Sequence, residues 1–116
     1  NNFPGFYLTD SGFKIEHRVE SVEEIAKIWG LRHSLNTDDT AIIVANPVVN
    51  QMDKTFHDEI LEAGLSAATA KAISGKGVTP FLLEHFHTTS KGESLRVNIE
   101  IIKANSKLAA QIACAL

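Results

Sequence analysis

The last 23 residues constrain this chain most, because their pattern predicts one long amphipathic helix over 94–116. Winding the segment at about 100° per residue brings six side chains onto one line. They are Asn98, Ile102, Asn105, Ala109, Ile112 and Leu116. Charged and polar side chains line the opposite side: Arg96, Glu100, Lys103, Lys107 and Gln111. The sequence therefore predicts that two asparagines point inward together with the isoleucines.

Two inward amides in a helix need hydrogen-bond partners. A buried carboxamide left without them costs on the order of 1–3 kcal/mol. The partners of Asn98 and Asn105 are either neighbouring backbone or a bound ligand, and the helical pattern alone leaves both alternatives open. An asparagine that fastens a loop end is the commoner case, because most side-chain hydrogen bonds go to backbone or water.

The composition is typical of a soluble globular protein and argues against two classes of partner. The 116 residues are 44% hydrophobic and 22% charged, with a net charge of -3. The charges are spread without basic blocks, so neither nucleic acid nor an anionic membrane is favoured. Apolar runs such as AIIVAN are too short to span a bilayer, and the first residues do not show the charged-then-apolar pattern expected of a leader. The chain begins at Asn1 and enters the aromatic run FPGFY at once, which we interpret as the middle of a longer protein.

Cap signals predict where four helices begin. SVEEIAKIWG carries a capping box in which Ser21 accepts from the backbone of Glu24 and Glu24 reaches back to Ser21, so a helix is expected to run into the thirties. Asp53 is expected to cap a second helix that ends near Gly75 and Gly77. Asp38 and Asp39 are expected to form a turn pair between these helices.

The third and fourth helices follow without a long connection. Thr79 and Pro80 form a cap and first-turn pair for the helix containing FLLEHF. Gly92 breaks that helix, and Ser94 opens the last one.

Two apolar runs predict strands. AIIVANP, residues 41–47, is continuous and β-branched, as in a parallel strand covered on both faces, and FPGFYL, residues 3–8, is typical of a strand or strand edge. We therefore expect an α/β fold, a three-layer α/β/α arrangement in which this chain supplies about two strands and four helices to a larger sheet. Two strands do not make a stable sheet alone. On this view 1–116 is the carboxyl-terminal segment of a single domain and not an independent domain.

No residue of this segment is predicted to be catalytic or to bind a metal. His85 and His87 would lie about 200° apart on a helix, which argues against a shared metal ion. The Gly75-to-Thr79 stretch lacks the spacing of a phosphate-binding loop and is interpreted as a helix stop. Cys114, the lone cysteine, is interpreted as packing.

Several motifs, taken in order, resemble one enzyme family. They are FPGFY, IIVANPV, ISGKGVTPFLLEHF and ESLRVNIEIIKANSKLAAQIACAL. Together they closely resemble the carboxyl-terminal third of the pseudouridine-5′-phosphate glycosidases. The resemblance implies reversible cleavage of the C–C glycosidic bond of pseudouridine 5′-phosphate to uracil and ribose 5-phosphate. It also implies a Schiff-base lysine, a proton-transferring carboxylate and a manganese ion, all held outside this segment.

The resemblance ranks the asparagines as candidate substrate-binding residues. Asn98 occupies the asparagine of the family's S-L-x-x-N-I motif and is the first candidate. Asn105 matches the second member of an Asn-Asn pair whose first position is Ala104 here, and Asn46 lies in the A-N-P turn. For Asn105 and Asn46 we favour a structural role.

The resemblance also implies a setting for the whole protein. We expect the whole protein to be a cytoplasmic homotrimer that acts on a small molecule. A mitochondrial or peroxisomal location and a fused sugar-kinase domain are left open. The alternative hypothesis is a non-catalytic remnant or scaffold fragment of the same fold.

Overall fold

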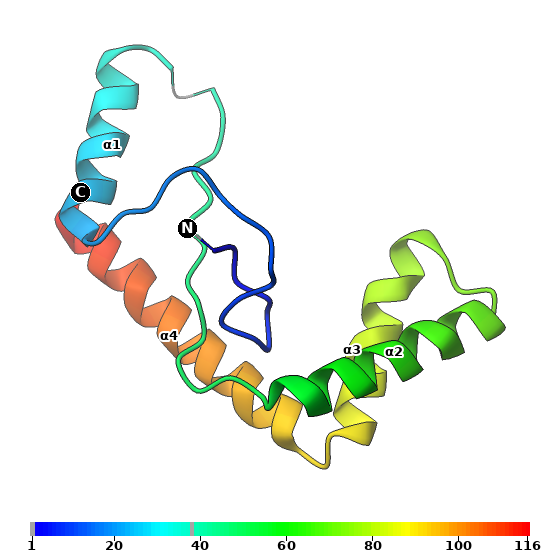
Figure 1. Ribbon diagram of the computed structural model, residues 1–116. Helices are drawn as coiled ribbons and strands as arrows, with labels where there is room; N and C mark the ends of the chain where they lie inside the picture. Colours follow the sequence, from blue (N-terminus) through cyan, green and yellow to red (C-terminus); the bar gives the residue numbers. More distant parts are fainter. Residues whose placement is uncertain (1, 38) are drawn as a thin grey trace.

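The computed structural model describes residues 2–37 and 39–116, in which helices are joined by irregular segments (Figure 1). The first residue and Asp38, one half of the predicted turn pair, lie outside this range. The described elements are α1 (Val22–Ser34), α2 (Lys54–Ala70), the 3₁₀ turn η1 (Gly75–Gly77), α3 (Val78–Thr89) and α4 (Glu93–Ala115). The four predicted helices are confirmed at their expected places in the chain.

The helix starts follow their predicted caps with local differences. The Ser21 hydroxyl accepts from the backbone N–H of Glu24 at 3.3 Å, but the Glu24 carboxylate accepts from the N–H of Glu20 instead of Ser21. The Asp53 carboxylate accepts from the N–H of Phe56 at 2.9 Å, which confirms the cap of α2. α3 begins at Val78, so the predicted cap and Pro80 both lie inside its first turn, where proline is tolerated.

The predicted α/β fold is wrong for this chain, because the described residues contain no strand. Only two isolated bridges occur among them, Asn2 to Lys14 and Gly5 to Leu8. Residues 41–47 carry no regular structure, and Ile43 is 87% exposed. A β-branched run favours extended backbone, but a strand also needs a second strand about 4.8 Å away, and no described segment takes that place.

The amino-terminal segment and the segment before α2 are joined by hydrogen bonds. The Met52 N–H donates to the Tyr7 carbonyl at 3.0 Å, and the Thr9 hydroxyl donates to the Val48 carbonyl at 2.8 Å. The two segments bring apolar side chains against α2, α3 and α4. The resulting core consists of Tyr7, Val48, Met52, Ile60, Phe86 and Val97.

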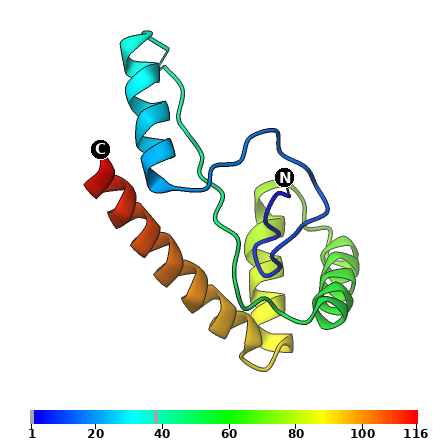
Figure 2. The same ribbon diagram turned by 60° about the vertical axis from the view of Figure 1, so that its left-hand side comes forward.

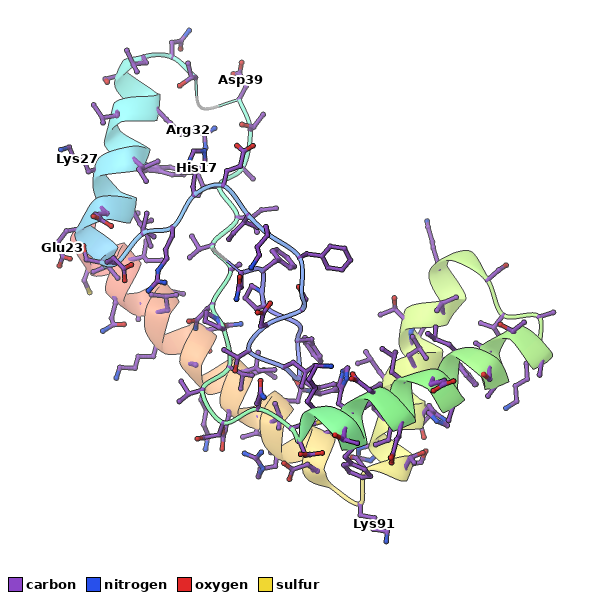
Figure 3. All side chains as sticks on the ribbon, viewed as in Figure 1. His17, Glu23, Lys27, Arg32, Asp39 and Lys91 are labelled. Atoms are coloured by element: carbon purple, nitrogen blue, oxygen red, sulfur yellow. The ribbon has the colours of Figure 1, made fainter. Side chains whose placement is uncertain are left out.

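The helices form an elongated molecule with two ends. α2 packs against α3 near the amino end of α4, whereas the start of α1 lies beside the carboxyl end of α4 (Figures 1 and 2). The irregular segments run between these two groups. Arg32 points from α1 toward the returning chain (Figure 3) and donates to the Thr37 and Thr40 carbonyls, which closes the loop after α1. The overall extents are 51 × 28 × 22 Å.

Candidate functional site

A cavity of about 330 Å³ opens where the amino-terminal segment meets α3 and α4. Its walls combine apolar side chains with a phenol, a carboxylate, an imidazole, a hydroxyl and a carboxamide. The lining residues are Tyr7, Pro80, Leu83, Glu84, His87, Ser94, Leu95 and Asn98. Concave sites that mix apolar walls with a few convergent polar groups are typical of small-molecule binding, and their volumes start at about 300 Å³.

Asn98 lies in the first turns of α4, one turn after Ser94, so both side chains share the helix face that borders the cavity. Ser94 is almost completely buried, whereas Asn98 is half-buried. Among the described residues, none hydrogen-bonds to the Asn98 carboxamide, and neither of its polar atoms is sealed from solvent. The amide is therefore open to a ligand in the cavity.

Tyr7 enters the cavity from a tight backbone turn. The backbone groups of Gly5 and Leu8 exchange two hydrogen bonds of 2.9 and 3.0 Å, and between them Phe6 adopts a φ of 52°. A bulky residue in the left-handed region stores strain, and such positions cluster at functional sites. Burial raises the pKa of the Tyr7 phenol, and its hydrogen bond to the Ser94 side chain lowers it by less. The phenol is thus a neutral hydroxyl near pH 7.

The other two predicted residues, Asn46 and Asn105, contact each other away from the cavity. The Asn46 Nδ2 atom donates to the Asn105 Oδ1 atom at 3.0 Å, which joins the segment before α2 to the middle of α4. Neither side chain lines the cavity that Asn98 borders. The structural role favoured for both residues stays a prediction.

The predicted inward line of α4 differs from its buried face. Ser94 and Val97 are buried and Ile101 packs on the core, whereas Ile102 is 59% exposed and Asn105 is exposed. The line through Ser94, Val97 and Ile101 is turned by about 65° from the predicted one. Asn98 is therefore at the margin of the buried face, and the prediction that Asn105 points inward is wrong.

Arg96, which the sequence pattern predicts only as part of the polar face, links three separate groups. Its guanidinium donates to Glu93 at 2.6 Å, to Glu100 at 2.9 Å and to the Asn50 carbonyl at 3.2 Å. Its hydrogen bond lowers the pKa of the Glu93 carboxyl. Glu93 lies three residues before Arg96 and Glu100 four residues after it, a spacing that predicts both ion pairs in a helix. No local pattern predicts the hydrogen bond to Asn50.

The histidines and the cysteine occupy separate environments. His85 faces α2 and stacks on Phe81 at a ring separation of 6.3 Å, while His87 borders the cavity. Cys114 is exposed. Across residues 2–37 and 39–116, no group of three or more His, Cys, Asp or Glu side chains is placed to hold a metal ion. The same ranges contain no helix long and apolar enough to cross a membrane.

Comparison with known proteins matches nearly the whole chain. The profile of the family described as Indigoidine synthase A like protein matches residues 1–115. A pseudouridine-5′-phosphate glycosidase of Salinispora tropica is 45% identical over 115 residues, which are 97% of this chain and 36% of the relative. A protein of the same name from Streptomyces griseus is 43% identical over 98% of this chain and 36% of its own length.

A further relative extends the same finding. A pseudouridine-5′-phosphate glycosidase of Fervidobacterium nodosum is 42% identical over 100% of this chain and 40% of its own length. The resemblance inferred from the sequence motifs is confirmed. The chain spans well under half the length of these relatives.

Proposed function

The chain belongs to the Indigoidine synthase A like family, and from that membership we propose that it is part of a pseudouridine-5′-phosphate glycosidase. The reaction is the reversible cleavage of a C–C glycosidic bond to give uracil and ribose 5-phosphate. The observation that carries the proposal is the 45% identity to a glycosidase over 97% of the chain. Because the chain covers only 36% of that relative, the activity is proposed for the complete enzyme.

The role proposed for this chain is to bind the sugar. The Asn98 carboxamide can donate to one ribose hydroxyl and accept from another without adding a charge. The neutral Tyr7 hydroxyl borders the same cavity. Uncharged, directional contacts of this kind can hold a sugar without shifting the pKa of a reactive amine placed beside it.

The bond-breaking groups belong, on this proposal, to polypeptide outside the matched segment. No lysine is among the described residues that line the cavity, and within the described residues no group of three or more His, Cys, Asp or Glu side chains could hold manganese. The lysine, the carboxylate and the manganese ion implied by the resemblance are therefore not assigned to this chain. For the complete protein we propose a cytoplasmic homotrimer, and the fused sugar-kinase domain stays an open alternative.

The test is a chimera in which this chain replaces the matched segment of the Salinispora tropica relative. Asn98→Ala is expected to lower kcat/KM for pseudouridine 5′-phosphate by about tenfold to a hundredfold, because one to two hydrogen bonds to the sugar are lost. Its melting temperature is expected to stay nearly unchanged.

Asn105→Ala is the matched control, since it removes the same amide from the same helix outside the cavity. It is expected to leave kcat/KM unchanged. A large loss of stability with normal kinetics for Asn98→Ala would return Asn98 to a structural role. A parent chimera that folds but releases no uracil would favour the non-catalytic remnant.

A further inference from the structure

α4 and the residue that follows it carry a second apolar face that the described chain leaves about half exposed. Its members are Leu95, Ile99, Ile102 and Leu116, which are between 44% and 65% exposed. At about 100° per residue they lie roughly 120° around the helix from the buried line through Ser94, Val97 and Ile101. We call Leu95, Ile99, Ile102 and Leu116 the second apolar face.

The charges of α4 avoid this face. All of them lie within about 80° of one another on the far side of the helix. They are Glu93, Arg96, Glu100, Lys103 and Lys107. Between Leu95 and Leu116 the second apolar face is continued only by small or amide side chains such as Ser106, Ala109 and Ala113. A helix that met water on this side would carry charged residues there, and a helix apolar on two sides is packed on both.

The exposed area of the chain is also larger than that of a compact monomer of the same mass. A compact monomer of this mass exposes about 6,200 Å², whereas this chain exposes 8349 Å². The excess, about 2,100 Å², is comparable with what one partner contributes to a large obligate interface, about 1,000–2,500 Å². The radius of gyration, 17.2 Å, likewise exceeds the roughly 13 Å of a compact domain of 116 residues.

We propose that the second apolar face of α4 is the docking surface for the polypeptide that the relatives carry outside the matched segment, and that this polypeptide forms the missing wall of the Asn98 cavity. The relatives supply a partner of sufficient length, since 36–40% of each is matched. Leu95 connects the two features, because it belongs to the face and also lines the cavity. A polypeptide seated on Ile99 and Leu95 therefore lies against the cavity mouth.

The proposal rests on family membership and not on the proposed reaction, so its test reads solvent access instead of turnover. Cys114 is first replaced by serine, because it is exposed and reacts with thiol reagents. Ile102→Cys then places a thiol on the second apolar face. Lys103→Cys, the next residue on the charged side of the same helix, is the matched control. Labelling rates are measured in the isolated chain and in the Salinispora chimera.

Docking predicts selective protection. The thiol at position 102 is expected to label at least about tenfold more slowly in the chimera than in the isolated chain, and the thiol at position 103 to change by less than about twofold. Equal rates at position 102 in both proteins would overturn the proposal. The intact Salinispora relative offers a check without a chimera. A thiol at the position aligned with 102 must label more slowly there than a thiol at the position aligned with 103.

A second copy of this chain is the competing occupant. If the thiol at position 102 becomes protected in the isolated chain as its concentration rises, and sedimentation shows a dimer, the face is a self-association surface and the proposal is wrong. A monomeric chain with a freely reactive thiol at position 102 supports it. Neither result depends on whether uracil is released, so failure of the proposed function is recognised separately.

Discussion

Asn98 and Asn105 show how strongly the environment of one residue type changes within two helical turns. Both are asparagines on α4, seven positions apart, and the helical period places them close to one line. Asn98 borders a cavity without a protein partner, whereas Asn105 accepts from Asn46 at 3.0 Å. The difference arises because Asn98 faces a cavity and Asn105 faces Asn46. The helical period predicts the direction of a side chain but not its partner.

Tyr7 provides a residue-scale prediction on pH. Its folded pKa lies above the ordinary value of about 10, because burial disfavours the phenolate more than the Ser94 hydrogen bond favours it. The folded chain keeps the proton at a pH where the unfolded chain loses it. The contribution to stability is complete below pH 10 and is lost as the pH rises through the folded pKa.

The measurement is direct because Tyr7 is the single tyrosine of the sequence. Its phenolate absorbance in the folded chain is expected to appear at a higher pH than in urea. The parent is expected to show a fall in the urea midpoint above about pH 10, and Tyr7→Phe is expected to flatten it, while lysine ionisation affects both proteins alike. Titration of the folded chain at the ordinary value would contradict the prediction.

Residues whose partners are close in sequence were predicted best. Ser21 and Asp53 cap their helices as expected, since a cap contacts a backbone N–H three residues away. The Glu24 carboxylate accepts from the N–H of Glu20 and not from that of Ser21, because neighbouring backbone N–H groups compete for it. The bond from Arg96 to the carbonyl of Asn50, 46 positions away, was not predictable.

At the scale of elements, the helices were predictable and the strands were not. A helix closes its hydrogen bonds within its own segment, so caps and period are sufficient evidence for it. A strand needs a partner that its own residues do not specify. Residues 41–47 satisfy the local criteria for a strand, yet the described chain offers them no neighbouring strand. Their link to α4 is the side-chain hydrogen bond from Asn46 to Asn105.

The pairing of α2 with α3 depends on Gly64. A Cβ atom there would lie 2.9 Å from the His85 Cδ2 atom and 2.9 Å from the Leu82 Cδ2 atom. Both neighbours belong to α3, and the His85 ring is held by stacking on Phe81. Gly64→Ala gains about 1 kcal/mol of helix propensity but overpacks the contact at about 1–3 kcal/mol. We expect a net loss of about 1 kcal/mol in the free energy of unfolding.

Gly30 is the matched control, because a Cβ atom there would meet no other atom within 4 Å. Gly30→Ala in α1 is expected to stabilise the chain by about 0.5–1 kcal/mol. Urea unfolding of the two variants measures the difference. If both substitutions stabilise the chain equally, the close contact of α2 with α3 is not rigid, and this account of the pair is wrong.

The whole molecule is held together through α4. α1 packs against α4 and no other described helix, and α2 reaches α4 through α3. That residues 1–116 form one segment of a larger domain, and not an independent domain, remains a prediction, and the elongated shape is compatible with it. Composition gave no sign of this shape, because the 44% hydrophobic content is ordinary. What is unusual is where that content lies, with the second apolar face of α4 left to solvent.

The isolated chain is therefore expected to be inactive. Cleaving a C–C glycosidic bond through a Schiff base requires an amine at the sugar, and no lysine is among the described residues that line the cavity. The lysines at 103 and 107 lie on the opposite side of α4 from Asn98, which borders the cavity. Incubation with pseudouridine 5′-phosphate and manganese, followed by chromatography, should detect no uracil, whereas the intact Salinispora relative serves as the positive control. Uracil released by the chain alone would mean that a lysine of this segment reaches the sugar, and would require a different assignment of the catalytic groups.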